Sequence, residues 1–440
     1  MEILLIWPKG PAPFQNDYDK NKLFFRILSQ FIPFRKPVTY SILAALTPNK
    51  HNVTIIEGGF SDIDFDKKYD IVGITSTTDL VYITYKIADE FIKRGTTVVI
   101  GGWHASALPF ETKKHADSVV IGEAEETWPE LIKDFQKGTI KPFYNQKRPV
   151  DAKLIPALYN VYPKERGLGI HATRGCPNCC KFCSITNMKF RKIYRMRPIS
   201  NVVKEISSSS NKVFAFQDAS LTINPKYTKE LFRKIIGLNK KFVVMGNIDT
   251  LGKDDELLKL ASEAGCLSWQ IGFESICQDS LNSVNKTKNI VKDYSKNIKK
   301  IQDYNIAVEG AFIFGFDHDT INIFDETDDF IRKNELKMAY ANALTPFPGT
   351  PLFDQLDSKG RILTKDWSKY DGHNYVVFQP KHMSPDELLY NVQELEQKWH
   401  SNSRAMNKIL KSLNYGIYNF FDVVFTEIGW KSTKNQLKKN

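Results

Sequence analysis

Short apolar runs alternate with amphipathic stretches along residues 1–140, and this rhythm restricts the fold more than any other feature of the chain. Short apolar runs are typical of buried strands, whereas apolar residues every three to four positions are typical of helices. Their alternation favours a parallel sheet covered on both faces, a flavodoxin-like (Rossmann-type) α/β domain that binds ligands at the carboxyl ends of its strands. The predicted strands are Glu2–Trp7, Val53–Glu57, Ile71–Ser76, Thr97–Gly101 and Ser118–Ile121, and the predicted helices are 38–46, 80–93 and 126–135.

A second strand–helix rhythm begins at Gly169, after a segment rich in Pro, Lys and Asn that we interpret as a linker. Its six strand–helix units are too few for a complete eight-stranded barrel. The predicted strands are Gly169–Ala172, Val213–Phe216, Phe242–Gly246, Leu267–Ile271, Ala307–Phe314 and Met338–Leu344. We therefore expect a ligand-binding domain at 1–140, a linker at 141–165, a second α/β domain at 166–350 and a helical extension at 351–440.

The C-terminal extension has helical patterns at Pro385–Trp399 and Ser403–Leu413, followed by the aromatic stretch Tyr415–Phe425. Most stripes of this kind are packed into a core. The alternatives are a cover for a hydrophobic substrate, or a membrane-surface helix assisted by the lysine-rich tail.

Composition and charge limit where the chain works and what it meets. No apolar run approaches the roughly 20 residues that a membrane span needs, and the N-terminus has no signal-peptide pattern, so we expect a cytoplasmic protein. The net charge of +11 comes mostly from scattered lysines on a solvated surface. It also suits an anionic lipid surface or an acidic electron donor such as flavodoxin or ferredoxin, whereas no nucleic-acid-binding motif is present.

Four cysteines lie within the segment 176–183, directly after a predicted strand. They contain the spacing C-x3-C-x2-C, and three thiolates on one loop can hold a 4Fe-4S cluster while leaving one iron open to a small molecule. The alternative is structural zinc, but two CxxC pairs that share a Cys-Cys junction are cramped compared with ordinary zinc knuckles. The remaining cysteines, Cys266 and Cys277, stand apart, and a long chain with few cysteines argues against a disulfide scaffold.

The stretch His171-Ala-Thr-Arg-Gly-Cys-Pro-Asn-Cys-Cys-Lys-Phe-Cys183 resembles the cluster loop of radical S-adenosylmethionine (SAM) enzymes. The resemblance implies that Cys176, Cys180 and Cys183 bind the cluster, with the aromatic Phe182 beside it. SAM would chelate the fourth iron and yield a 5'-deoxyadenosyl radical. It also implies that the six strands form the partial (β/α)6 TIM-type barrel of that family.

Polar residues follow the predicted barrel strands, where the family binds SAM. The resemblance assigns contacts with SAM to Asp218, Asn247, Glu274 and Ser275, the last two within the segment Gly272-Phe-Glu-Ser275, and adenine contacts to the region of Thr345. Each of these side chains could equally cap a helix or serve the fold.

Two loops of the first domain resemble the cobalamin slot of cobalamin-binding proteins. Ser76-Thr77-Thr78 ends the third predicted strand, and Gly101-Gly102 ends the fourth. Ser76 and Thr78 offer hydroxyls and the glycines leave room for the nucleotide tail. The run 116–127 also resembles the segment that closes this domain. The motif D-x-H-x-x-G is absent from Pro8–Tyr18, so we expect no histidine from that loop on cobalt. His104 could still be a ligand, but a histidine beside a loop more often makes an ordinary hydrogen bond, which we expect here.

Together these resemblances imply a cobalamin-dependent radical SAM enzyme, with a methyltransferase that uses methylcobalamin on an unactivated carbon of a small molecule or lipid as the leading hypothesis. The alternatives are an enzyme with the same cofactors but without net methylation, such as a tetrapyrrole cyclase or a ring-contracting enzyme, or a non-catalytic sensor. No general base is required, because the cofactors supply the chemistry and the protein supplies positioning.

Overall fold

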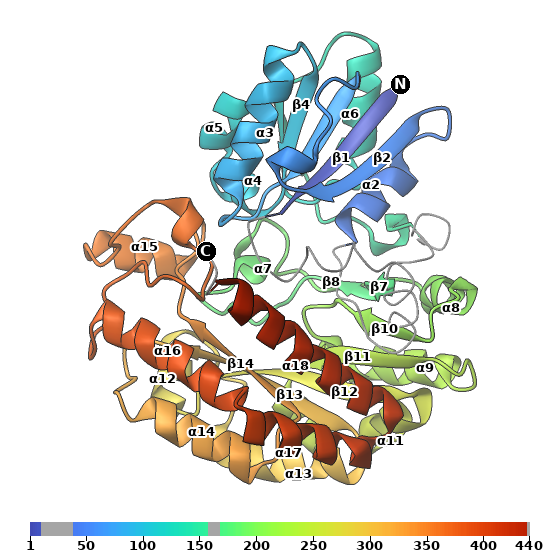
Figure 1. Cartoon of the computed structure of the whole chain (residues 1–440). Coiled ribbons are helices and arrows are strands. Elements are labelled where there is room, and N and C mark those ends of the chain that lie inside the picture. The colour runs from blue at the N-terminus through green and yellow to red at the C-terminus, as the bar shows by residue number, and fades with distance from the viewer. Residues whose placement is uncertain (10–37, 157–167, 438–440) are drawn as a thin grey trace.

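Two parallel six-stranded sheets organise the computed structural model, which describes residues 1–9, 38–156 and 168–437 and side chains as far as Lys431 (Figure 1). The first sheet has the order β2-β1-β3-β4-β5-β6. Helices cover both of its faces, and apolar side chains pack beneath them in two separate layers. Its strands are β1 (Glu2–Pro8), β2 (Asn52–Gly58), β3 (Ile71–Thr75), β4 (Thr97–Gly101), β5 (Ser118–Ile121) and β6 (Phe143–Asn145), and its longer helices are α2 (Thr39–Leu46), α3 (Val81–Lys93) and α6 (Thr127–Gln136).

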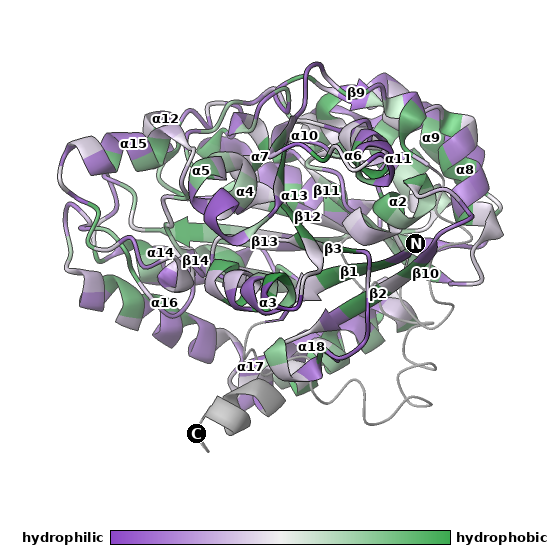
Figure 2. Cartoon of the chain, turned by 90° about the horizontal axis from the view of Figure 1, so that it is seen from above, coloured by the Kyte–Doolittle hydropathy of each residue, from purple (hydrophilic) through white to green (hydrophobic). Residues whose placement is uncertain are grey.

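The order of the first five strands confirms the predicted flavodoxin-like topology. Strands β1, β3 and β4 are inaccessible on both faces because their residues are mostly Ile, Leu and Val, as expected for a parallel sheet between two helical layers. Strand β1 is green along much of its length in Figure 2, whereas α16 at the periphery carries much purple. Strand β6 was not predicted; it pairs with β5 from within the segment expected to be a linker.

The second sheet has the order β14-β13-β12-β11-β10-β7, and every pair in it is parallel. Its two edge strands do not pair with each other, so the sheet forms the predicted partial barrel. The strands are β7 (Leu168–Ile170), β10 (Val213–Phe216), β11 (Lys241–Gly246), β12 (Cys266–Glu274), β13 (Ala307–Phe314) and β14 (Met338–Ala343), and the covering helices include α8 (Ile199–Ser208), α9 (Pro225–Ile235), α11 (Asp255–Ala264), α13 (Tyr294–Asp303) and α14 (Ile323–Lys333).

The cysteine segment lies between the two sheets, in the excursion from β7 to β10 (Figure 1). Two short antiparallel strands, β8 (Thr173–Arg174) and β9 (Arg195–Met196), close the base of this excursion, and the short helix α7 (Ser184–Asn187) follows the last cysteine. The loop is therefore held at both ends, and between them the amide of Lys181 donates to the carbonyl of Val284 in the barrel domain at 3.0 Å.

The C-terminal helices pack on the barrel, and the predicted helix at Pro385–Trp399 is present with those bounds as α16. The others are α15 (Pro351–Ser358), α17 (Asn402–Ser412) and α18 (Ile417–Leu437). Helix α18 crosses in front of β11 to β13 in Figure 1. The Lys337 ammonium is buried and lies 2.6 Å from Asp422 and 2.8 Å from Asn419 of α18, and 3.1 Å from Glu309 of β13.

Tyr418 of α18 also packs against Val213 and Val243 of the barrel strands. Together these contacts make α18 part of the barrel's packing. Within the described part of the chain, no residue of the aromatic stretch lines the cavity between the domains. The prediction that this stretch covers a hydrophobic substrate therefore gains no support from its position.

Parts of two predictions fall on residues outside the described ranges, namely the first strand-to-helix loop beyond Lys9 and the linker beyond Pro156. None of the helices in the described residues combines the length and the apolar character required to cross a bilayer.

Candidate functional site

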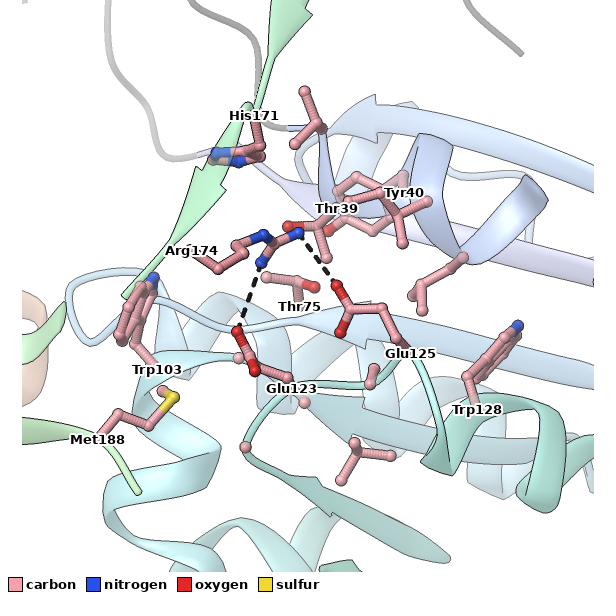
Figure 3. A pocket seen from close by; sticks show the side chains of 18 of the residues that line it. Thr39, Tyr40, Thr75, Trp103, Glu123, Glu125, Trp128, His171, Arg174 and Met188 are labelled. Atoms are coloured by element: carbon pink, nitrogen blue, oxygen red, sulfur yellow. Dashed lines mark ion pairs between the residues drawn. The ribbon is translucent and has the colours of Figure 1, made fainter. Parts of the chain in front are cut away.

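A cavity of about 290 Å³ lies between the two domains. On one side it enters the first domain between helix α2 and the sheet, and on the other it reaches the strand β8 that leads into the cysteine loop (Figure 3). Residues that line it include Thr39, Tyr40 and Leu43 of α2, Gly73 and Thr75 of β3, Gly101, Gly102 and Trp103 after β4, Val120, Glu123, Glu125 and Trp128, and His171, Thr173, Arg174, Met188, Arg191 and Gln217.

The two predicted glycines differ in how much space surrounds the position where a side chain would begin. Gly101 lines the cavity, and a methyl group added there would only make ordinary contact with Val120 at 3.5 Å. Gly102 has a φ of +101°, and a methyl group there would lie 2.7 Å from the carbonyl oxygen of Ser76. Gly102 is therefore required by the crossing of two backbone segments, whereas space for a ligand is available at Gly101.

Ser76 and Thr78 are buried and lie outside the cavity lining among the described residues. The Ser76 hydroxyl donates to the carbonyl of Thr77 at 3.1 Å, and the Ser76 amide donates to the carbonyl of Gly101 at 2.8 Å. The structure thus brings the two predicted loops together. It uses Ser76 to join them, and the predicted contact of Ser76 and Thr78 with cobalamin stays a prediction.

His104 is fully buried in the first domain, where its Nε2 lies 3.2 Å from Glu111. Its ring meets the edge of Trp367, and burial lowers the pKa of the imidazole. This is the ordinary hydrogen bond that the sequence suggested.

Buried nitrogen atoms without a hydrogen-bond partner lie on the barrel side of the cavity. Among the residues that line it, they include Nε of Arg174 and Nδ1 of His171, and also Nε of Arg191, which still forms an ion pair with Glu123. Burial, and then the neighbouring arginines, hold the pKa of His171 well below its ordinary value, so its ring is neutral. A buried polar atom without a hydrogen-bond partner is costly. Cobalamin carries several amide side chains, each with a carbonyl acceptor and N–H donors, so these residues fit that group.

Carboxylates from the loop after β5 face arginines of the cysteine segment across this cavity. Arg174 reaches between Glu125, at 3.0 Å, and Glu123, at 3.8 Å (Figure 3). Burial alone would raise the pKa of Glu123, but Arg195, Arg191 and Arg174 together hold it below its usual value. Glu123 is therefore ionised at neutral pH, and the domains meet through a buried ionic network.

The cysteine loop is fixed by hydrogen bonds to its own backbone. Asn187 of α7 donates to the carbonyls of Cys180 and Cys183 at 2.9 and 2.8 Å, and Thr186 donates to that of Cys176 at 2.7 Å. Burial raises the pKa of the Cys180 thiol to about 12, so a thiolate there needs a metal's positive charge.

All four thiols of the loop are free, and Cys179, the one that we predict not to be a ligand, is the exposed one. In the described ranges, no three His, Cys, Asp or Glu side chains form a group suited to a single metal ion. The assignment of Cys176, Cys180 and Cys183 to a four-iron cluster stays a prediction.

Glu274 ends strand β12 in a left-handed conformation, with a φ of +64°. Its carboxylate lies 2.7 Å from the ammonium of Lys286. Burial alone would lower the pKa of Lys286, but Glu274 and the nearby thiols of Cys180 and Cys183 raise it. A strained residue at a strand end is characteristic of functional sites. Ser275 accepts the amide of Cys277 at 3.0 Å and so serves the following turn.

The other predicted SAM-binding side chains have partners within the protein. Asp218 accepts from the amide of Ala172 at 3.2 Å and from the amide and hydroxyl of Thr173, which ties the end of β10 to the start of the cysteine segment. Burial raises the pKa of Asp218 to about 6. Asn247 caps the helix that follows it, through the amides of Asp249 and Thr250.

Two predicted residues complete this set. Thr345 donates to the carbonyl of Ala343 at 3.1 Å, and the Phe182 ring lies 6.2 Å from that of Phe316. The sequence reasoning missed the cavity-lining residues Arg174, Arg191 and Gln217. Arg174 stood within the quoted cysteine motif, and Gln217 stood beside Asp218, but no local pattern distinguished them.

Comparison with known proteins finds a matching family model for each of the two domains. Residues 170–331 match the family model of the radical SAM superfamily, and residues 37–132 match that of the B12 binding domain. The bacteriochlorophyllide d C-12(1)-methyltransferase of Chlorobaculum tepidum is 34% identical over 86% of both chains. The bacteriochlorophyllide d C-8(2)-methyltransferase of the same organism is 31% identical over 85% of this chain and 90% of the relative.

Solved structures share the fold. The radical S-adenosylmethionine methyltransferase TsrM from Kitasatospora setae, with cobalamin and a [4Fe-4S] cluster bound, superimposes with a TM-score of 0.70 and 16% identity, covering 99% of both chains. The cobalamin-dependent S-adenosylmethionine radical enzyme OxsB, with aqua-cobalamin and S-adenosylmethionine bound, has a TM-score of 0.68 and 15% identity, covering 93% of this chain and 68% of OxsB.

Proposed function

Because this chain belongs to the radical SAM enzymes that carry a B12-binding domain, and so uses a 4Fe-4S cluster, SAM and cobalamin, we propose that it methylates an unactivated carbon of a chlorin-type tetrapyrrole. When bound, the cluster and SAM supply a carbon radical on the substrate, and cobalamin supplies the methyl group. The observation that carries this proposal is the likeness, over 86% of both chains, to a relative named for methyl transfer to bacteriochlorophyllide d.

The chain's own residues would bind and orient these groups. Gly101 would leave room for the cobalamin tail, while Arg174 would donate to its amide carbonyls and His171 would hydrogen-bond its amide groups from the barrel side. On the other side of the cysteine loop, Glu274 would accept from the ammonium group of SAM, next to Lys286. No side chain needs to act as a base, so the protein's task is positioning and the exclusion of water.

The proposal is tested with reconstituted enzyme, SAM labelled with deuterium in its methyl group, and bacteriochlorophyllide d as the first substrate. Mass spectrometry should show one labelled methyl group in place of one hydrogen. Unlabelled product of unchanged mass would contradict methylation.

A second candidate function is ring closure without net methylation. The anaerobic magnesium-protoporphyrin IX monomethyl ester cyclase of Cereibacter sphaeroides is 27% identical over 73% of this chain, and the match spans 58% of that cyclase. A methylated product excludes this candidate, whereas a product that has lost hydrogen without gaining a methyl group favours it.

We also propose that the chain works in the cytoplasm and receives electrons from an acidic flavodoxin or ferredoxin. Lys189, Lys192 and Lys288 are exposed, and in the described part of the chain none of them pairs with a carboxylate. Reduction of the cluster by flavodoxin should slow steeply with added salt if charges guide the encounter. A rate independent of salt would contradict this role.

A peripheral contact with membranes is a further proposal for this chain. Met406 and Leu410 of α17 and the following Leu413 are about half exposed, at helical spacing. Sedimentation with anionic vesicles should carry the protein down, and a protein that stays in the supernatant contradicts the contact.

A further inference from the structure

One carboxylate joins the first domain to both ends of the cysteine segment. Glu123 follows β5, and its side chain is 1% exposed. Arg195 of β9 contacts it with both terminal nitrogens, at 2.5 and 3.1 Å, and Nε of Arg191 lies 3.2 Å away. Arg174 of β8 lies 3.8 Å away and pairs with Glu125 at 3.0 Å.

The three arginines flank the predicted cluster ligands on both sides. The amide of Cys176 donates to the carbonyl of Arg191 at 2.8 Å. Gly175, between Arg174 and Cys176, has a φ of +85°, and a methyl group on it would lie 2.6 Å from that same carbonyl oxygen. A shift of Arg174 or Arg191 therefore displaces the backbone that presents Cys176.

Within the first domain, Glu123 is held in place by hydrogen bonds to the segment that follows β6. The amide of Glu123 donates to the Gln146 side chain at 2.9 Å, and the Gln146 amide group donates back to the Glu123 carboxylate at 3.2 Å. Arg195 also donates to the carbonyl of Val150 at 3.1 Å. The guanidinium of Arg191 lies 5.3 Å from the ring centre of Trp103, which follows the glycine pair.

The backbone of Glu123 is thus fixed within the first domain, whereas its carboxylate is fixed by arginines of the cysteine segment. Buried ionic groups of this kind contribute little net stability, because desolvation offsets attraction, but they restrict the geometry in which charges can be satisfied. Removing the Glu123 charge leaves buried guanidinium groups uncompensated, and the interface then relaxes toward water.

We propose that Glu123 is a positioning residue that sets the separation and orientation of cobalamin relative to the 4Fe-4S cluster. The inference rests on the cofactor content of the family and does not depend on which substrate is methylated. A methyl donor and a radical source that act on one carbon must be held at a fixed spacing, since small displacements greatly reduce the rate of an oriented reaction.

The test uses the full chain with reconstituted cluster and cobalamin, reduced so that both centres are paramagnetic. Pulsed dipolar electron paramagnetic resonance measures the distance distribution between cob(II)alamin and the reduced cluster, without any substrate. Wild type should give one narrow distribution. Glu123→Gln should retain four iron and one cobalamin per chain but lose the narrow distribution, with more 5'-deoxyadenosine released per SAM consumed in the absence of substrate.

The matched control is Glu126→Gln. Glu126 lies in the same segment but pairs with Arg148 at the surface, 2.7 Å away, and its variant should keep the wild-type distribution. If Glu123→Gln does not load both cofactors, Arg195→Gln carries the test, since it leaves Arg191 and Arg174 near Glu123. A loaded variant with the wild-type distribution overturns the proposal, and so does failure of both variants to load, which would make Glu123 a folding residue. Neither result bears on methyl transfer, which product mass decides.

Discussion

Alanine at Gly102 should destabilise the chain, whereas alanine at Gly101 should leave its stability unchanged and weaken cobalamin binding. Gly102 has a φ of +101°, where an L residue is strained, and an added methyl group would lie 2.7 and 2.9 Å from the backbone oxygen and nitrogen of Ser76. Backbone strain of this kind costs about 1–3 kcal/mol. The overlap with the backbone of Ser76 places Gly102→Ala at the upper end, at about 3 kcal/mol.

A loss of that size lowers the melting temperature of a domain of this size by about 6–12 °C. Gly101→Ala meets nothing closer than 3.5 Å, so its stability should stay within about 0.5 kcal/mol of wild type. Because Gly101 lines the cavity, its methyl group should weaken cobalamin binding by about tenfold, which corresponds to 1.4 kcal/mol.

The assays are thermal unfolding of the cofactor-free chain and spectrophotometric titration with cobalamin. A Gly102→Ala protein as stable as wild type would refute the argument from the Ser76 crossing. Wild-type affinity in Gly101→Ala would refute the placement of the cobalamin tail beside Gly101.

Three further predictions concern the cluster and two buried carboxylates. Alanine at any of the three predicted cluster ligands should abolish SAM cleavage and four-iron loading, whereas Cys179→Ala should spare both; an essential Cys179 would contradict the assignment. Asp328→Asn should cost about 2–3 kcal/mol in denaturant unfolding, because, against the effect of burial, Arg404 and Lys398 hold the pKa of this buried carboxyl at about 2. The exposed Asp329→Asn should cost less than about 0.5 kcal/mol, and the difference between these variants should shrink as the pH falls from 4 toward 2. Burial raises the pKa of Asp218 to about 6, so wild-type stability should decrease relative to Asp218→Asn as the pH rises from 4 through 6; a constant difference would contradict that shift.

The two sheets could be predicted because their strands carry a local signal. Apolar runs separated by amphipathic stretches gave the strands from Glu2 to Ile121 and from Val213 to Leu344 without any knowledge of contacts. Strand β6 carries no such signal, because Phe143–Asn145 is short and becomes a strand only by pairing with β5. Tertiary pairing therefore decided this strand, and the same holds for the short pair β8 and β9, which periodicity could not show either.

At the site, the sequence indicated which positions lie near the cavity better than which way their side chains point. Gln217 and Asp218 follow the same strand, yet Gln217 lines the cavity while Asp218 turns away and accepts from the amide and hydroxyl of Thr173. Which of two neighbours faces inward depends on the local twist at the strand end. The pairing of Glu123 with Arg195 joins residues far apart in the chain, and neither side chain has a local pattern that reveals its partner.

The central claim, methyl transfer by this enzyme, is tested most directly by the mass of its product. Reconstituted protein is incubated with deuterium-labelled SAM, cobalamin, reductant and bacteriochlorophyllide d, and the tetrapyrrole is analysed by mass spectrometry. We expect the substrate to gain one labelled methyl group in exchange for one hydrogen, with 5'-deoxyadenosine formed in equal amount. A tetrapyrrole product of any other mass, formed with SAM cleavage but without label, would contradict the claim.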